Sequence, residues 1–291
     1  MIIVTGATGQ LGRLVIDALL QTVPASRIVA AVRSPDKATD LAARGVVVRK
    51  ADYTQPETLD SALAGGEKLL LISSSAVGQR VPQHRAVIDA AKRAGIKLIA
   101  YTSVLRADTS PLGLAEEHKQ TEALLQDSGI PFVLLRNGWY TENYAASIPA
   151  ALAHGVVLGS AGDGQISSAA RIDYAAAAAM VLTREHQAGR VYELAGDASF
   201  TLTELAAEIA RQSGKAVAYK NLPEADYKAA LIGFALPEPI AHLLADSDAG
   251  ASKGGLHHNG RDLSSLIGRA TTPMAASVEA ALRGDLAGSA H

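Results

Sequence analysis

The sequence predicts an α/β protein with a Rossmann-type, doubly wound parallel sheet and a smaller C-terminal α/β lobe. The chain opens on a short apolar run, followed at once by three glycines, Gly6, Gly9 and Gly12, and then by a helical pattern. Short apolar runs alternate with helical patterns as far as Arg136, after which this rhythm changes. Strands separated by helices require right-handed crossovers, which give a parallel sheet with helices on both faces.

The opening stretch, residues 1–12, predicts a dinucleotide site. Its glycines suit a tight turn after the strand, a close approach of a pyrophosphate to the backbone, and a helix packed hard on its strand. The amides that open this helix face the phosphates, with the positive end of the helix dipole behind them. The spacing is G-x-x-G-x-x-G rather than the common G-x-G-x-x-G, and a bare glycine triplet also fits an ordinary turn. The strand before it and the helix after it favour the nucleotide site.

Further elements follow the glycine turn in regular order. Five more strands are expected, at residues 27–33, 46–52, 69–72, 98–101 and 132–135. Helices are expected between them, the longest over residues 81–94 and 114–126. Ser34 with Pro35 is typical of a helix start, and Thr54 with Glu57 predicts a capping box.

The second half of the chain is less regular. Helices are expected over residues 145–153 and 173–182, a strand that returns to the main sheet over 191–194, and a helix capped by Thr201 with Glu204. We therefore expect an NADP-binding domain of residues 1–140 with returning segments 166–196. Residues 141–165 and 197–291 are expected to form the smaller lobe, which covers the carboxyl ends of the strands, where ligands of such folds bind. Residues 288–291 are expected to fray.

Composition excludes several classes of protein. The 291 residues include 27 Lys and Arg against 29 Asp and Glu, so no basic field exists to attract nucleic acid. Cysteine is absent, which excludes disulfides, thiolate nucleophiles and cysteine-based metal sites. The N-terminus lacks a basic leader and no apolar run is long enough to span a bilayer. We expect a cytoplasmic protein without a membrane partner and without a metal.

The choice of cofactor is expected to depend on the end of the second strand. Enzymes that prefer NAD usually place a carboxylate there, on the ribose hydroxyls, whereas this chain has Arg33, with Lys37 one turn further on. A guanidinium binds a 2′-phosphate well, so the sequence predicts NADP(H), although a solvated surface arginine is the alternative. Asp52 is suitably placed either for the adenine edge or for capping a helix start.

Polar residues follow three of the later strands. The fourth expected strand ends in Ser73, Ser74 and Ser75, and the fifth in Tyr101, Thr102 and Ser103. These hydroxyls suit contacts with the cofactor or a substrate carbonyl, but small polar residues are also ordinary at strand ends. The sixth strand leads to Trp139 and Tyr140, whose rings suit either the wall of a flat-ring site or core packing.

The chain resembles a known family at several of these places. TGATGQLG with Arg33 is similar to the atypical, NmrA-like branch of the extended short-chain dehydrogenases. The segments KLLLISSS, YTSVLRADTSPLGLAEEH, LRNGWYTENY and DSDAGASKGGL resemble, more narrowly, bacterial NADPH-dependent quinone oxidoreductase type 2, and more distantly triphenylmethane reductase. The resemblance implies reduction of quinones. It also implies NADPH binding by the following residues: Gly6, Ala7, Thr8, Gly9, Gln10, Leu11, Arg33, Ser73, Ser74, Ser75, Asn137, Gly138, Trp139, Tyr140, Thr141 and Glu142.

The catalytic pair of the wider superfamily is missing. Aligning on Glu122 puts His118 where the lysine of Tyr-x-x-x-Lys is expected and Leu114 where the tyrosine is expected. A ketone that accepts hydride forms a strongly basic oxygen and needs such an acid, whereas the oxygen of a reduced quinone is far less basic. We therefore expect direct hydride transfer to a quinone, without flavin. His118 suits a proton donor by its usual pKa, but a surface histidine on a helix is the more ordinary interpretation.

The sequence does not decide which residues are catalytic. The candidates are Tyr140, Asn137, Ser103 and His118. Two other functions remain alternatives: an NmrA-like redox sensor that binds NADP(H) without catalysis, and a reductase of cationic dyes or activated imines and ketones. The G-x-S-x-G match at Gly250, Ser252 and Gly254 lacks a preceding strand, which argues against a serine hydrolase. His257 and His258 are adjacent and so lack the spacing of helical zinc ligands.

Overall fold

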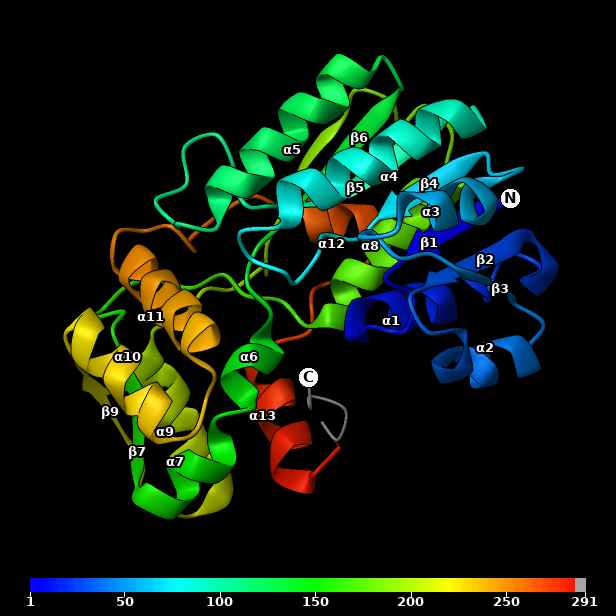
Figure 1. Cartoon of the computed structure of the whole chain (residues 1–291). Coiled ribbons are helices and arrows are strands. Elements are labelled where there is room, and N and C mark those ends of the chain that lie inside the picture. The colour runs from blue at the N-terminus through cyan, green and yellow to red at the C-terminus, as the bar shows by residue number, and fades with distance from the viewer. Residues whose placement is uncertain (286–291) are drawn as a thin grey trace. The chain divides into compact units, whose positions relative to one another are not determined.

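A computed structural model describes residues 1–285 of the chain (Figure 1). These residues divide into two compact units. The first unit consists of Met1–Ala107, Glu116–Asn137 and Arg171–Glu193, and the second of Asp108–Ala115, Gly138–Ala170 and the chain from Leu194 onward. The fraying expected for residues 288–291 lies outside the described residues.

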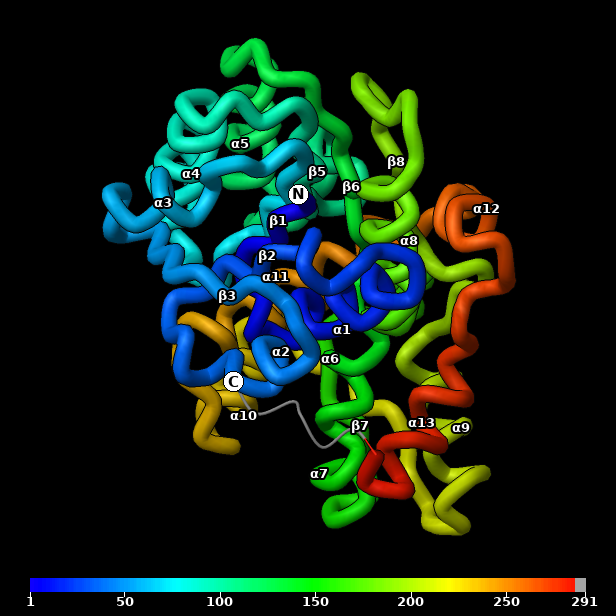
Figure 2. Tube along the Cα trace, turned by 90° about the vertical axis from the view of Figure 1, so that its right-hand side faces the viewer, coloured from blue at the N-terminus to red at the C-terminus, as the bar shows by residue number. Residues whose placement is uncertain are grey.

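The first unit is built on a seven-stranded sheet in the order β3-β2-β1-β4-β5-β6-β8. The first six strands pair in parallel, and Figure 2 shows β8 beside β6, at the edge opposite β3. This is the strand order of dinucleotide-binding folds, so the predicted doubly wound sheet is confirmed. The strands are β1 (Ile2–Thr5), β2 (Ile28–Val32), β3 (Val47–Lys50), β4 (Lys68–Leu71), β5 (Leu98–Val104), β6 (Phe132–Asn137) and β8 (Val191–Leu194).

Helices cover both faces of this sheet (Figure 1). One face packs on α3, α4 and α5, which share a core with strand residues such as Ile3, Leu69 and Ile99. On the other face α1 packs against α8, and five consecutive alanines of α8 allow this close approach. The helices of the unit are α1 (Gln10–Leu19), α2 (Thr39–Ala43), α3 (Pro56–Leu63), α4 (Arg80–Ala94), α5 (Ala115–Ser128) and α8 (Arg171–Thr183), with short 3₁₀ turns at Ala25–Arg27 and Pro35–Ala38.

The second unit carries a small sheet of two parallel strands, β7 (Val156–Gly159) and β9 (Ala218–Asn221). The capping box predicted at Thr201 and Glu204 is confirmed at the start of α9. The G-x-S-x-G match lies at the end of α11 with no strand before it, as expected. The helices of this unit are α6 (Thr141–Ala145), α7 (Ile148–His154), α9 (Leu202–Ser213), α10 (Glu224–Gly233), α11 (Glu238–Ser252), α12 (Asp262–Ile267) and α13 (Met274–Arg283).

Several expected elements are wrong in detail. The capping box at Thr54 does not form: α3 begins at Pro56, and the Thr54 amide donates instead to Asp52. The helix expected over residues 145–153 begins later, as α7, and the short helix α6 before it was not expected, nor were β7 and β9. Within the part of the chain that the structure describes, no helix has both the length and the apolar character that crossing a membrane requires.

Candidate functional site

The turn between β1 and α1 has the geometry of an anion cradle. Gly6 adopts a φ of +60°, which favours glycine, and its carbonyl accepts the Gly9 amide at 2.9 Å. A Cβ on Gly12 would overlap the Gly6 carbonyl oxygen and lie 2.7 Å from Cα of Ala7. Since Gly9 is the N-cap of α1 and has no side chain, it supplies no side-chain cap to the first amides of the helix.

Thr5 fixes this turn to the neighbouring strand, a role that the sequence did not suggest. Its hydroxyl donates to the Leu70 carbonyl at 3.0 Å and accepts the Ile72 amide at 3.1 Å. The ends of β1 and β4 are therefore held together directly below the glycine turn.

Arg33 follows β2 at the same edge of the sheet. Thr5 pairs with Ala31, so the residues after β1 and β2 emerge side by side. The Arg33 side chain is exposed and makes no hydrogen bond or ion pair within residues 1–285. Asp52 accepts hydrogen bonds from the amide and hydroxyl of Thr54, which lower its pKa together with the charge of Arg33. Asp52 does not cap α3, whose N-cap is Gln55 and has no side-chain capping hydrogen bond, and its contact with the adenine edge stays a prediction.

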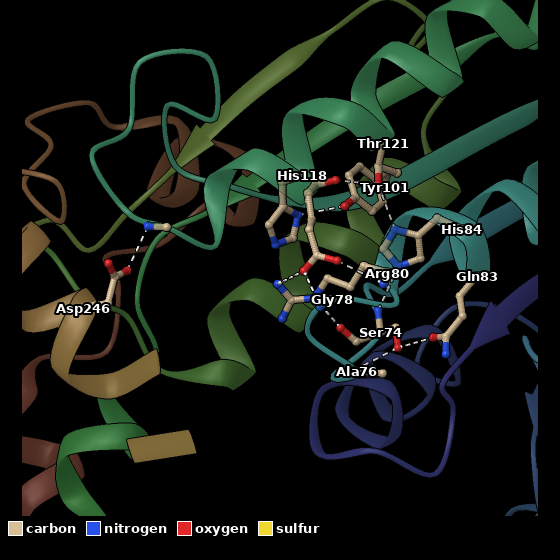
Figure 3. Close-up of polar contacts among 12 residues, drawn as sticks. Ser74, Ala76, Gly78, Arg80, Gln83, His84, Tyr101, His118, Thr121 and Asp246 are labelled. Carbon is tan, nitrogen blue, oxygen red and sulfur yellow. Dashed lines mark hydrogen bonds and ion pairs between the residues drawn. The ribbon is translucent and has the colours of Figure 1, made fainter. Parts of the chain in front are cut away.

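The loop after β4 is fixed through every polar group of Ser74 (Figure 3). Its amide donates to Nε2 of His84 at 2.9 Å, its carbonyl accepts from Nε of Arg80 at 2.6 Å, and its hydroxyl donates to Gln83. Ser73 is held by its amide, which donates to Thr102 at 2.8 Å. The Ser74 hydroxyl therefore helps to hold this loop in place.

These contacts define the proton positions on His84. Because Nε2 accepts the Ser74 amide, the proton lies on Nδ1, which donates to the Thr121 hydroxyl at 3.0 Å. Thr121 in turn donates to the Glu117 carbonyl at 2.8 Å. Burial, assisted by the charge of Arg80, lowers the pKa of His84 to about 3, so the ring is neutral.

His118 is buried rather than on the surface, so the surface interpretation was wrong. Its Nδ1 lies 2.7 Å from the Tyr101 hydroxyl, as Figure 3 shows, and burial lowers its pKa to about 3. The reason lies in the helix: Ala115, His118, Thr121 and Leu125 form the buried stripe of α5. His118 is consequently unprotonated at neutral pH.

Ser103 lies within β5 rather than after it, because the strand continues to Val104. Its hydroxyl donates to Glu122 at 2.6 Å, and Glu122 accepts two hydrogen bonds from Arg136. Arg136 also binds Glu193 at 2.8 Å. Burial opposes the charge of Arg136, but the bonds to both carboxylates outweigh it and raise the pKa of the guanidinium.

Asn137 ends β6 with an unused acceptor. The residue is 6% exposed, and its Oδ1 is buried without a hydrogen-bond partner among the described residues. Buried acceptors are rarely left in this state, which indicates a ligand donor at this position.

Comparison with known proteins agrees with this geometry. Residues 6–185 match the family described as NAD(P)H-binding. The chain is 64% identical to quinone oxidoreductase 2 of Escherichia coli, over 96% of this chain and 97% of that protein. The chain belongs to the quinone oxidoreductase type 2 family.

Solved structures support this family assignment. The crystal structure of the NADPH-dependent quinone oxidoreductase QOR2 of Escherichia coli, complexed with NADPH, superimposes with a TM-score of 0.94 at 64% identity, over 96% of this chain and 99% of that one. Triphenylmethane reductase of Citrobacter sp., complexed with NADP(H), gives a TM-score of 0.93 at 40% identity, over 97% of this chain and all of that one.

The remaining predicted site residues belong to the second unit. Thr141 donates its amide to the Ala169 carbonyl and shares a hydroxyl contact of 2.8 Å with Ser168, while the Trp139 carbonyl accepts the Ala169 amide. The segment from Gly138 to Glu142 is therefore fastened to residues 168–169. Trp139 and Tyr140 are half-buried, and Trp139 lines a pocket of about 550 Å³ within this unit, as does Asn143.

Proposed function

We propose that the chain is an NADPH-dependent quinone reductase that transfers hydride directly from the nicotinamide to a quinone. The similarity to quinone oxidoreductase 2, sustained over nearly the whole of both chains, carries the assignment of the substrate. The exposed Arg33 beside the glycine turn supports the phosphorylated form of the cofactor. Bound NADPH supplies the hydride, and the chain supplies binding and orientation.

We assign the parts of the cofactor to residues by their chemistry. The amides at the start of α1 bind the pyrophosphate, since they offer donors and the positive end of the helix dipole. Arg33 binds the 2′-phosphate through its guanidinium. Asn137 accepts an N–H donor of the cofactor at its unused Oδ1. The other residues proposed to contact it are Ala7, Thr8, Ser73, Ser75, Gly138, Trp139, Tyr140, Thr141 and Glu142.

The positions of the candidate acids support a quinone over a simple ketone. His118 is buried and unprotonated, and the Ser103 hydroxyl is committed to Glu122. Neither group therefore supplies a proton at neutral pH. A reduced quinone takes its proton from water or a weak donor, because its oxygen is only weakly basic. Tyr140 remains the candidate for a residue in contact with the acceptor.

A turnover assay tests this function. The purified protein is mixed with NADPH and a simple quinone, and oxidation of the nicotinamide is followed by its absorbance, with the rate without protein subtracted. We expect steady turnover with the quinone and none with a plain cyclic ketone. Tight NADPH binding without turnover of any quinone would overturn the proposal in favour of a sensor. Turnover of a cationic dye but of no quinone would favour the dye reductase.

A further inference from the structure

The loop after β4, residues 72–75, lies against the glycine turn of the first unit. Strands β1 and β4 are neighbours in the sheet, with Val4 paired to Leu70, so the chain leaves both strands side by side. A Cβ on Gly6 would lie 3.6 Å from Cβ of Ile72, which is ordinary van der Waals contact. The shape of this loop therefore affects what the glycine turn can bind.

Three consecutive backbone amides of this loop are held by side chains. Each donates to a different element: Ile72 to the Thr5 hydroxyl at 3.1 Å, Ser73 to the Thr102 hydroxyl at 2.8 Å, and Ser74 to Nε2 of His84 at 2.9 Å. The hydroxyls of the half-buried Ser73 and the exposed Ser75 form no hydrogen bond within residues 1–285. The loop thus has a fixed backbone and two hydroxyls that a ligand can use.

Helix α4 holds Ser74 from one of its faces. Arg80 and His84 are four residues apart, so their side chains leave the helix on the same side. His84 accepts the Ser74 amide, and Nε of Arg80 donates to the Ser74 carbonyl at 2.6 Å (Figure 3). Both side chains are buried, and Arg80 is only 7% exposed. Ser74 therefore cannot move without breaking two hydrogen bonds to buried groups.

Helix α5 in turn fixes the histidine ring and the start of α4. Nδ1 of His84 donates to the Thr121 hydroxyl at 3.0 Å. Glu117 accepts the amides of Gly78 and Arg80 at 3.1 and 3.2 Å, where α4 has no side-chain cap of its own. A carboxylate is favourable at the N-terminus of a helix. The ring that holds Ser74 is thus oriented from a second helix.

We propose that His84 is a positioning residue for NADPH binding: by accepting the Ser74 amide, it keeps the hydroxyls of Ser73 and Ser75 where the cofactor meets them. A neutral imidazole suits this role, because one ring nitrogen accepts while the other donates to Thr121 and fixes the ring. The inference rests on the proposed function, since it takes NADPH to bind beside the glycine turn.

Two variants of His84 separate positioning from stability. In His84→Gln the side-chain oxygen takes the place of Nε2 and still accepts the Ser74 amide, whereas in His84→Asn the shorter amide group reaches Thr121 but not Ser74. Both variants lose one buried hydrogen bond, so their unfolding midpoints should fall alike. We expect NADPH affinity, measured by fluorescence titration, to fall about tenfold in His84→Asn and less than about threefold in His84→Gln. Equal affinities of the two variants would overturn the proposal and make His84 a structural residue only.

A variant of α5 tests the same arrangement without changing the ring or the loop. Thr121→Val keeps the shape of the side chain but removes the acceptor of His84, and should lower NADPH affinity about three- to tenfold. In turnover, this loss should appear in the KM for NADPH more than in kcat. Thr183→Val is the matched control: each threonine donates at 2.8 Å to the carbonyl four residues before it, but Thr183 makes no hydrogen bond to His84.

Unchanged affinity in Thr121→Val, or an equal loss in Thr183→Val, would contradict the proposal. The titrations contain no quinone, so a failure of this inference is distinguished from a failure of quinone reduction. If the unaltered chain did not bind NADPH, the proposed function itself would be wrong.

Discussion

The Tyr101 hydroxyl lies 2.7 Å from Nδ1 of His118, and both side chains are buried in the first unit. The sequence around Glu122 predicts that His118 takes the position of the superfamily's catalytic lysine, yet here it forms a contact inside the core. His84 lies beside the same tyrosine, with ring centroids 5.5 Å apart. The chain thus keeps two neutral histidines next to the loop that carries Ser74.

These two histidines predict a loss of stability in mild acid. Burial lowers both pKa values from 6.5 to about 3. The unfolded chain therefore binds two protons below about pH 6.5 that the folded chain does not accept until about pH 3. The contribution of the two neutral histidines to the unfolding free energy is fully present above about pH 6.5. It decreases as the pH falls, by about 1.4 kcal/mol per pH unit for each histidine. Urea unfolding at several pH values between about 6.5 and 5 measures this slope.

Single histidine variants separate the contributions. His118→Asn should roughly halve the pH dependence of the unfolding free energy. His242→Asn, which alters an exposed histidine of α11, should leave it unchanged. If His118→Asn preserves the full slope, His118 is not held neutral in the folded protein.

Gly12→Ala should damage both the fold and the cofactor site. The new Cβ would meet backbone atoms of Gly6 and Ala7, which cannot move without opening the turn. We expect a loss of about 1–3 kcal/mol in unfolding free energy and a marked weakening of NADPH binding. Gly233→Ala is the control, because a Cβ there meets no atom within 4 Å and α10 should gain slightly in stability. Unchanged NADPH affinity in Gly12→Ala would show that the turn does not bind the cofactor.

Arg136→Met should be strongly destabilising, since it removes the guanidinium that pairs with the carboxylates of Glu122 and Glu193. Removing one member of a buried ion pair costs about 3–5 kcal/mol. Arg211 pairs with Glu208 on the surface of α9, and Arg211→Met should leave the unfolding midpoint unchanged. Equal midpoints for both variants would mean that the buried network contributes little.

Asn137→Leu should weaken NADPH binding without lowering the stability of the unliganded protein. The substitution removes a buried acceptor that has no hydrogen-bond partner within residues 1–285, so the unliganded protein should be as stable as before or more stable. NADPH affinity should fall about tenfold, because the cofactor loses its acceptor. Calorimetric titration with thermal unfolding measures both quantities. A loss of stability with unchanged affinity would assign Asn137 a structural role only.

The fold of the first unit was largely predictable because its strands are buried on both faces. Strands β1, β2, β4, β5 and β6 appear in the sequence as continuous apolar runs with glycine or polar residues after them. In the small sheet of the second unit β7 reads VVLG and is also an apolar run before a glycine, but its partner β9 reads AYKN and is mostly exposed, so β9 gave no such signal. The capping box expected at Thr54 requires the Thr54 amide to donate to Glu57. That amide donates to the side chain of Asp52 instead, which the sequence pattern alone did not reveal.

The position of His118 could have been predicted. Its immediate neighbours, Glu116, Glu117, Lys119 and Gln120, give the segment the composition of a surface helix. The buried stripe is visible only at a spacing of three and four residues, through Ala115, Thr121 and Leu125. The sequence did not reveal that, among the described residues, the buried Oδ1 of Asn137 has no hydrogen-bond partner and the buried carboxyl group of Asp248 has no ion pair. Both features depend on which side chains distant segments place around these residues.

The most direct test of the cofactor assignment compares NADPH with NADH on Arg33→Glu. We expect this variant to lose roughly ten- to hundredfold in NADPH affinity and almost none in NADH affinity, as measured by fluorescence titration. Lys215→Glu, which makes the same charge change at an exposed site in the second unit, should alter neither. Equal losses for both nucleotides, or no loss for either, would contradict the claim that Arg33 binds the 2′-phosphate.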